Sequence, residues 1–211
     1  MHPGPRFRLL LALGAALLVS LGAASEARAD KKERLQEKLQ LCAGCHATDG
    51  NSVIPQNPRL AGLNEEYLEQ QMADFKSGAR KSVVMAAIAS TLDHESIDEL
   101  AEYFSEQKPA KGPPADAKLA AQGKAIYDEG IAGSAVPACS GCHNDDGSGT
   151  DKYPRLAGQH PAYVADQLLR FRSGERANDA KSAMRAVAKR MNDDEIKAVS
   201  EYVATLTGGA E

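Results

Sequence analysis

Apolar side chains recur at helical spacing along most of this chain, and loops rich in glycine, proline and asparagine separate the periodic segments. One helical face precedes Gly78 and consists of Tyr67, Leu68, Gln71, Met72 and Phe75. Another consists of Ile97, Leu100, Ala101 and Phe104. The strand–helix–strand alternation of an α/β fold is absent from the sequence. The pattern therefore predicts an all-α protein.

Helix boundaries can also be predicted. Residues 30–41 and 118–129 are rich in helix-forming side chains and form a leading helix in each half of the chain. Asn64, Asp93 and Asn192 occupy positions typical of N-caps, and Glu195 follows Asn192 at capping-box spacing. Each half thus has a leading helix, a central helix and a capped final helix.

The plan of the first half returns in the second. Residues 154–158 repeat the Pro-Arg-Leu-Ala-Gly of residues 58–62 at an offset of 96. Six further residues match at this offset: Tyr163, Gln167, Phe171, Ser173, Gly174 and Arg176 correspond to Tyr67, Gln71, Phe75, Ser77, Gly78 and Arg80. Residues 109–114 contain three prolines and a glycine and are expected to form a linker. We expect tandem domains at 30–108 and 115–211.

The chain begins with features of a secretory signal peptide. Arg6 and Arg8 precede an apolar run over 9–24, and Ala27-Arg28-Ala29 has the A-x-A cleavage pattern. A signal peptide over 1–29 predicts export. An uncleaved membrane anchor is the alternative, because the run approaches the length of about 20 residues that spans a bilayer.

Net charge restricts the partners. Cleavage after Ala29 leaves 182 of the 211 residues, with 22 basic and 28 acidic side chains and a net charge of −6. An acidic chain is a poor ligand for nucleic acid and for an anionic membrane surface. Partners are therefore expected among proteins, with at most peripheral membrane association.

Every cysteine belongs to one of two Cys-x-x-Cys-His motifs, which end at His46 and His143. Cys42 and Cys45, like Cys139 and Cys142, have the spacing that forms thioethers to the two vinyl groups of a porphyrin, and the next imidazole then lies against the iron. A disulfide, a thioredoxin-like pair or half of a zinc site would leave the two histidines unexplained. We predict two covalently bound c-type haems.

The repeat also selects candidates for the sixth iron ligand. Met72 and Met191 correspond to Leu168 and Leu92, so they are interpreted as core residues. Met85 and Met184 alone coincide, at an offset of 99. These two are the predicted axial ligands opposite His46 and His143.

Histidine is the competing ligand. His94 corresponds to Asp193 and His160 to Asn64, so neither has a counterpart in the other half. Both are expected to lie exposed near helix starts, and bis-histidine ligation is disfavoured.

The matched Pro-Arg pairs are candidates for supporting the haems. Pro58 and Pro154 could present a carbonyl to the second ring N–H of each histidine, and Arg59 and Arg155 could pair with haem propionates. The alternative is that Pro-Arg-Leu-Ala-Gly simply starts a helix.

Taken together, the two Cys-x-x-Cys-His motifs, Met85, Met184, both Pro-Arg-Leu-Ala-Gly segments and the linker resemble the dihaem cytochrome c4 family over essentially the whole mature chain. The resemblance implies two cytochrome c folds related by a pseudo-twofold axis, with the haem edges facing one another. It also implies a periplasmic electron carrier that feeds a terminal oxidase.

The expected function is one-electron transfer in a respiratory chain, not catalysis. The upstream partner would be a quinol-oxidising complex or a dehydrogenase, and the downstream partner an oxidase. Two alternatives use the same motif: a cytochrome subunit of a dehydrogenase or sulfur-oxidising complex, and a dihaem peroxidase. Residues 30–108 carry a net charge of −5 and residues 109–211 one of −1, so the two haems are expected to differ in environment and potential.

Overall fold

The computed structural model describes residues 32–113 and 115–209. The predicted signal peptide lies outside these residues. Among the described residues no strand is formed, and β pairing is limited to three isolated bridges, between Arg80 and Arg176, Ile131 and Val136, and Thr150 and Tyr153. The prediction of an all-α fold is confirmed.

A helix over residues 32–46 opens the described chain. Residues 32–39 belong to one structural unit and residues 40–209 to another. The sequence predicted a leading helix over 30–41. The observed helix extends beyond residue 41, because it continues through the first cysteine motif. No helix in the described ranges combines the length and the apolar composition that crossing a membrane requires.

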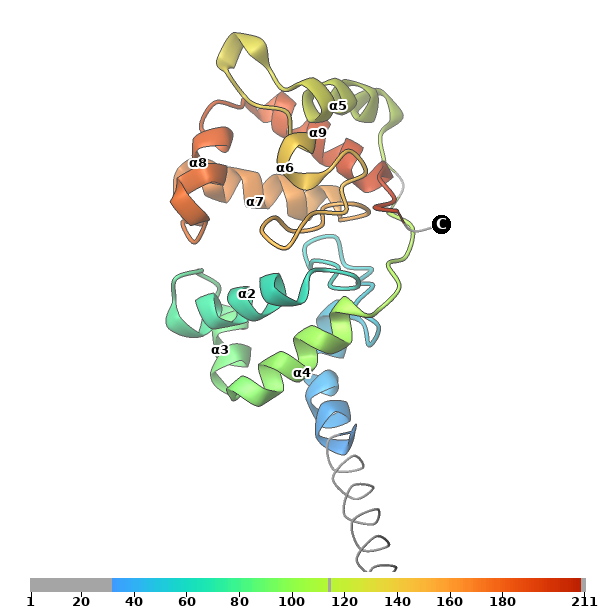
Figure 1. The fold of residues 1–211 in the computed structure, drawn as a ribbon, viewed down its shortest axis with the longest axis vertical. Coiled ribbons are helices and arrows are strands. Elements are labelled where there is room, and N and C mark those ends of the chain that lie inside the picture. The colour runs from blue at the N-terminus through green and yellow to red at the C-terminus, as the bar shows by residue number, and fades with distance from the viewer. Residues whose placement is uncertain (1–31, 114, 210–211) are drawn as a thin grey trace, which may run out of the picture. The chain divides into compact units, whose positions relative to one another are not determined.

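The first half, defined here as residues 40–113, contains α2 (Glu65–Ser77), α3 (Val83–Ser90) and α4 (His94–Ser105), which pack together (Figure 1). The buried side chains of α4 are those of the predicted face, Ile97, Leu100, Ala101 and Phe104, together with Glu99. α2 ends where predicted, because Gly78 adopts a left-handed conformation with φ of 80°. Burial of apolar side chains at helical spacing thus forms the core of this half.

The second half, residues 115–209, contains seven short and long helices: α5 (Ala117–Glu129), η1 (Ala132–Ser134), α6 (Ser140–His143), α7 (Pro161–Ser173), η2 (Ala180–Ser182), α8 (Ala183–Ala188) and α9 (Asp193–Thr205). α5 and α9 make the closest pair (Figure 1). A Cβ at Gly123 would lie 2.0 Å from the carbonyl oxygen of Ala198, so only glycine permits this approach. Tyr127, fully buried in the same crossing, packs edge-on against Tyr202.

The predicted caps are confirmed for the final helix of each half. Asp93 accepts a hydrogen bond from the amide of Ser96, and Asn192 forms a complete capping box with Glu195. Asn64 precedes α2 as expected, but its side chain makes no cap hydrogen bond. That side chain has a partner in the other half, which is described below.

The two halves meet through a reciprocal set of polar contacts. Arg80 donates to Gln71 in its own half, and across the interface to the Tyr163 hydroxyl at 2.9 Å and to Gln167 at 2.7 Å. The counterpart contacts run from Arg176 to Gln167, to the Tyr67 hydroxyl at 3.1 Å and to Gln71 at 3.0 Å. Both arginines are under 9% exposed, and each stacks on a phenylalanine of its own half. This exchange of equivalent contacts is what pseudo-twofold symmetry requires.

Candidate haem attachment sites

The four cysteines occupy matching helical positions. Cys42 and Cys45 lie in the helix over 32–46, and Cys139 and Cys142 lie at the cap and inside of α6. None is in a disulfide; Cys45 and Cys142 are exposed, while Cys42 and Cys139 are half-buried. Burial raises the pKa of Cys42 and of Cys139 to about 11, so both are protonated thiols at neutral pH. Each pair thus presents one exposed and one sheltered thiol.

The histidine that follows each pair is buried and has a defined tautomer. His46 and His143 are 8% and 6% exposed. Nδ1 of His46 lies 2.8 Å from the carbonyl oxygen of Pro58, and Nδ1 of His143 lies 2.9 Å from that of Pro154. A carbonyl only accepts, so Nδ1 carries the proton and the Nε2 lone pair remains available to a metal. Desolvation by burial lowers the pKa of both rings, against a smaller effect of this hydrogen bond, and favours neutral imidazole.

A tight loop holds each proline carbonyl in place. The residues after the histidines, Ala47 and Asn144, have φ of 62° and 64°, so the chain turns at once into the left-handed region. The loop is then closed by the carbonyl of Gly50, which accepts from Leu60 at 2.7 Å, and in the second half by that of Gly147, which accepts from Leu156 at 2.8 Å. The two loops differ by one residue in length and still bring the same carbonyl to the same ring nitrogen.

Arg59 and Arg155 use their terminal nitrogens on backbone carbonyls. Arg59 donates to Ala110, Lys111 and Gly158, and Arg155 donates to Thr207 and Gly208. In both side chains Nε is buried and has no hydrogen-bond partner in the described part of the protein. Burial lowers the pKa of both guanidinium groups, an effect that an anion at Nε would oppose. The matched orphan donors are consistent with the carboxylate-bearing rim of a haem.

The methionines selected by the repeat lie near the starts of equivalent helices. Met85 is the third residue of α3, and its amide donates to the Ser82 cap at 3.2 Å. Met184 is the second residue of α8 and packs, half-buried, on the same core cluster as Cys139. The approach to Met184 is strained, because Lys181 and Ser182 both have positive φ, of 53° and 58°.

Two expectations about other residues have different outcomes. The side chain of His94 is 92% exposed and pairs with Asp98, as expected. The expected exposure of His160 is wrong: this ring is 3% exposed, and its Nε2 lies 2.8 Å from the Ser52 carbonyl oxygen of the first half. Met191, Leu92 and Leu168 are buried core residues, whereas Met72 is half-buried.

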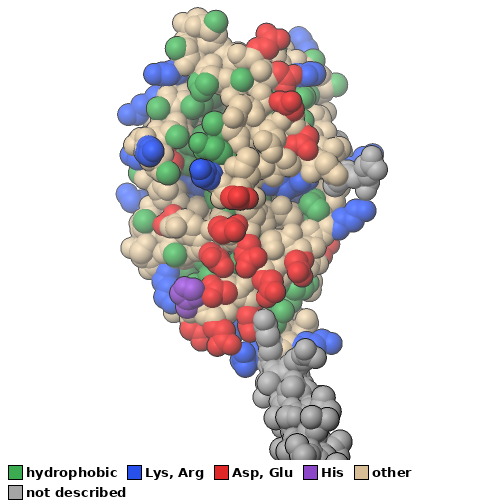
Figure 2. All heavy atoms as spheres, in the orientation of Figure 1, with side chains coloured by type: hydrophobic (Ala, Val, Ile, Leu, Met, Phe, Trp, Pro, Cys, Tyr) green, Lys and Arg blue, Asp and Glu red, His purple; other side chains and the backbone are tan. Residues whose placement is uncertain are grey.

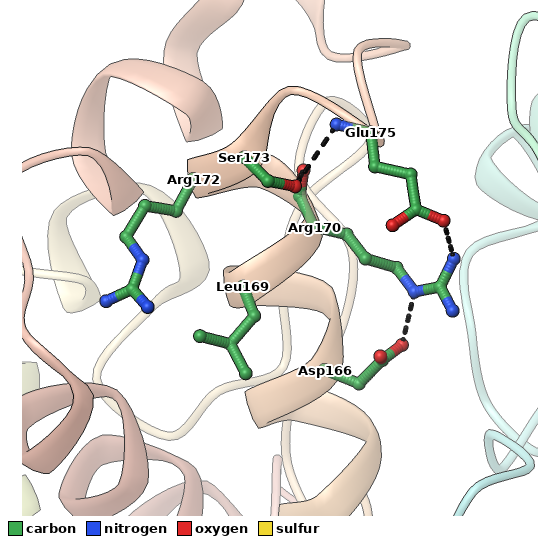
Figure 3. A pocket seen from close by; sticks show the side chains of 6 residues that line it. All are labelled: Asp166, Leu169, Arg170, Arg172, Ser173 and Glu175. Carbon is green, nitrogen blue, oxygen red and sulfur yellow. Dashed lines mark hydrogen bonds and ion pairs between the residues drawn. The ribbon is translucent and has the colours of Figure 1, made fainter.

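Other binding features are weaker. Within residues 32–113 and 115–209 no group of three or more His, Cys, Asp or Glu side chains is arranged to hold a metal ion. A surface hollow beside α7 is lined by Asp166, Leu169, Arg170, Arg172, Ser173 and Glu175 (Figure 3). Its charges are all paired, since Arg170 pairs with both Asp166 and Glu175, and Arg172 pairs with Asp193 outside the hollow. The hollow includes none of the residues predicted to bind haem.

Comparison with known proteins identifies the family. The family model described as Cytochrome c matches residues 120–207. Cytochrome c4 of Pseudomonas aeruginosa is 41% identical over 174 residues, which cover 81% of this chain and 86% of the relative. The chain belongs to the cytochrome c4 family.

Further relatives agree with this family. The crystal structure of reduced recombinant cytochrome c4 from Pseudomonas stutzeri superposes with a TM-score of 0.78 at 40% identity, over 82% of this chain and 97% of that one. The thiosulfate dehydrogenase electron acceptor of Thiomonas intermedia is 36% identical over 77% of both chains. As a cytochrome c4 family member, the protein has two cytochrome c domains, covalently bound haem and a role in electron transport.

Some residues of the site were missed by the sequence analysis. Gln159 bonds the backbone of Arg59 twice, at 2.9 and 3.0 Å, and Asn64 accepts from the amide of Arg155 at 3.3 Å. The repeat contained a signal for Gln159, because this polar residue directly follows its Pro-Arg-Leu-Ala-Gly segment while the counterpart Leu63 is apolar. A polar residue that replaces an apolar one beside a repeated motif indicates a contact that only one copy makes.

Proposed function

We propose that this protein is an exported dihaem electron carrier in which each half binds one haem. Cys42 and Cys45 attach the first and Cys139 and Cys142 the second. His46 with Met85, and His143 with Met184, are the axial ligands. The domains extend over 30–108 and 115–211, joined by the linker 109–114, after a signal peptide cleaved near Ala29 directs the chain to the periplasm.

One observation carries this proposal: each motif histidine is buried, neutral and locked by a proline carbonyl in the tautomer that frees Nε2. The same arrangement occurs twice, once after each cysteine pair. A zinc site made by the four cysteines, or a redox-active disulfide, would give the histidines no such role.

The bound haem supplies reversible one-electron chemistry at its iron. The protein's residues set how favourable that exchange is. Met85 and Met184 would bind the iron through their thioethers, which would favour the reduced state relative to a second histidine and would leave no position open to small molecules. The hydrogen bond to Pro58 or Pro154 orients the imidazole and raises its basicity. The free Nε of Arg59 or Arg155 would meet a propionate.

The proposed partners are redox proteins, with a quinol-oxidising complex or a dehydrogenase upstream and a terminal oxidase downstream. Encounters would be weak and salt-sensitive, as is usual between redox proteins. Acidic side chains gather on the first half (Figure 2), and this surface favours cationic partner faces. Glu69 of α2 lies near three like charges, those of Asp98, Glu65 and Glu66.

A second candidate function is that of an electron acceptor bound to a dehydrogenase. The observation that favours it is the 36% identity to the thiosulfate dehydrogenase electron acceptor of Thiomonas intermedia over most of both chains. Addition of thiosulfate and such a dehydrogenase to the oxidised protein tests this role. Rapid reduction of both haems would support it, and slow reduction with fast quinol-dependent reduction would favour the respiratory carrier.

An optical spectrum of the purified holoprotein tests the ligand assignment. We expect two haems per chain by haem quantitation and a weak red charge-transfer band of Met-ligated ferric haem at twice the single-haem strength. Carbon monoxide binding to the reduced native protein, or absence of the red band, would contradict the proposal and favour a dihaem peroxidase or another ligand set.

A further inference from the structure

The acceptor of each histidine hydrogen bond is a peptide group with a second partner. The carbonyl of Pro58 and the N–H of Arg59 belong to one peptide. The carbonyl accepts from His46 at 2.8 Å, while the N–H donates to Oε1 of Gln159 at 2.9 Å. His46 and Gln159 therefore bind opposite ends of the same conjugated unit, and Gln159 belongs to the other half of the molecule.

The second half contains the reciprocal arrangement. The carbonyl of Pro154 accepts from His143 at 2.9 Å, and the N–H of Arg155, in the same peptide, donates to Oδ1 of Asn64 at 3.3 Å. Asn64 belongs to the first half. Each histidine is thus linked through one peptide group to a side chain from the opposite half.

The orientation of the Gln159 amide follows from its neighbours. Its Oε1 faces the N–H of Arg59 and the N–H of His160, and its Nε2 faces the carbonyl of Arg59. A flipped amide would set donor against donor and acceptor against acceptor. Gln159 is also 6% exposed, so water competes little for these bonds.

We infer that Gln159 and Asn64 are positioning residues that tune the haem of the opposite half through these shared peptides, an inference that rests on the proposed axial role of His46 and His143. A peptide whose N–H donates a hydrogen bond gains negative charge on its carbonyl oxygen, because hydrogen bonds in a chain polarise one another. The carbonyl then accepts more strongly from Nδ1–H, the imidazole becomes a better electron donor, and the ferric state is favoured.

The two relays are unequal. The bond from Arg59 to Gln159 is shorter than that from Arg155 to Asn64, and Gln159 is buried whereas Asn64 is half-buried. The opposite half therefore affects the reduction potential of the first haem more strongly than that of the second. Contact between the halves, and not only local charge, separates the two potentials.

Gln159→Leu in the full holoprotein tests the first relay, because leucine already occupies the equivalent position at Leu63. Loss of the relay should favour the ferrous state. We expect the ratio of ferrous to ferric iron in the first haem, at a fixed applied potential, to rise by about threefold. This corresponds to about 30 mV for a one-electron couple. The Nδ1–H proton of His46 in the reduced protein should shift upfield, while the potential and ring proton of the second haem stay unchanged.

Two further variants make the test decisive. Asn64→Ala should move only the second haem, in the same direction and by less. Tyr163→Phe removes a hydrogen bond between the halves, the one from Arg80, without touching either shared peptide, and should move neither ring proton.

The relay would be overturned if Gln159→Leu shifted the potentials and ring protons of both haems equally and Tyr163→Phe did the same. That result would indicate a general loosening of the interface between the halves. Unchanged potentials and ring protons in Gln159→Leu and Asn64→Ala would also overturn the relay. If Gln159→Leu fails to fold, Asn64→Ala alone decides between these outcomes. Haem content and the red band, measured on the same samples, separate failure of the relay from failure of the proposed ligands.

Discussion

The two halves have the same contacts around the histidine of each cysteine motif and different surroundings. In each half a histidine forms a hydrogen bond with a proline carbonyl, and the residue after it adopts a left-handed backbone conformation. Each half also has an arginine whose buried Nε has no hydrogen-bond partner in the described part of the chain. They differ in the approach to the methionine: α3 is capped by Ser82, whereas α8 follows two residues with positive φ. Duplication has therefore preserved what holds the proposed cofactor and changed what surrounds it.

The surfaces differ as well. Residues 30–108 carry a net charge of −5 and residues 109–211 one of −1. On the first half, burial and then the like charges of Asp98, Glu65 and Glu66 raise the pKa of Glu69. Valines at 83 and 84, 91% and 65% exposed, precede Met85, where the second half has Ser182 and Ala183. Partner recognition is thus expected to favour the first half.

Replacement of the proposed methionine ligands should have the largest effect. We expect Met85→Ala and Met184→Ala each to remove half of the red charge-transfer band. Each should also lower the potential of one haem by on the order of 0.2 V, a fraction of the range of about 0.8 V that axial ligands span. Met72→Leu, which copies Leu168, is the control and should leave both unchanged. Spectra and a redox titration of all three variants check this, and an intact band in Met85→Ala would refute the assignment for the first half.

Loss of an interface arginine should come next. Arg80→Met removes the arginine donor to the Tyr163 hydroxyl, and Arg176→Met removes that to the Tyr67 hydroxyl. Either variant also leaves the buried oxygens of Gln71 and Gln167 with one arginine donor in place of two. We expect each to lower the free energy of unfolding by about 2–4 kcal/mol. Denaturant titration measures this, with the exposed Lys81→Ala as control. A difference of more than about 2 kcal/mol between the two variants would contradict the symmetry of the interface.

The next effect concerns the pH dependence of stability and His160, whose counterpart in the first half is Asn64. Burial, and to a lesser extent Arg59, lower the pKa of His160 below its ordinary 6.5. The unfolded chain then binds more protons than the folded one, so stability falls as the pH drops below about 6.5, by at most about 1.4 kcal/mol per pH unit. His160→Asn, which copies Asn64, should remove this part of the dependence. Unfolding titrations at pH 7.5 and 5.5 check it, and parallel pH profiles for wild type and variant would disprove the role of His160.

Surface charge should have the smallest effect. Neutralising Glu65, Glu66 and Glu69 together with glutamine is expected to slow oxidation of the reduced protein by tris(phenanthroline)cobalt(III) about threefold at low ionic strength. Asparagine at Asp145, Asp151 and Asp194 of the second half is the matched control and should slow it less. Stopped-flow rates over a range of salt concentrations measure the difference, and equal slowing would remove the preference for the first half.

Most of the fold followed from the sequence because its determinants are local. The apolar faces of α2 and α4 and the caps Asp93 and Asn192 depend on neighbours within a turn or two. The proline carbonyls were also predictable, since in both halves a short loop that ends at a proline returns the chain to the histidine. The internal repeat selected the two methionines proposed as iron ligands, because no local pattern distinguishes them from core residues.

The contacts between the halves could not be predicted in this way. His160 is buried, and its ring forms a hydrogen bond with a backbone carbonyl 108 residues away. Every residue has a backbone carbonyl, so the sequence does not indicate which one serves as the acceptor. Arg59 and Arg155 show the same limit, because their terminal nitrogens bind carbonyls of segments whose side chains play no part. The repeat paired Arg80 with Arg176, but only the fold shows that each reaches the tyrosine of the other half.

The arginines of the two Pro-Arg-Leu-Ala-Gly segments have one more consequence. Arg59 fixes the chain at Ala110 and Lys111 as it leaves α4, and Arg155 fixes it at Thr207 and Gly208 as it leaves α9, 97 residues later in both cases. Each half therefore holds in place the chain that leaves its own last helix. A second copy of such a half, joined after the first, would find the connecting chain already fixed by the arginine of the preceding half.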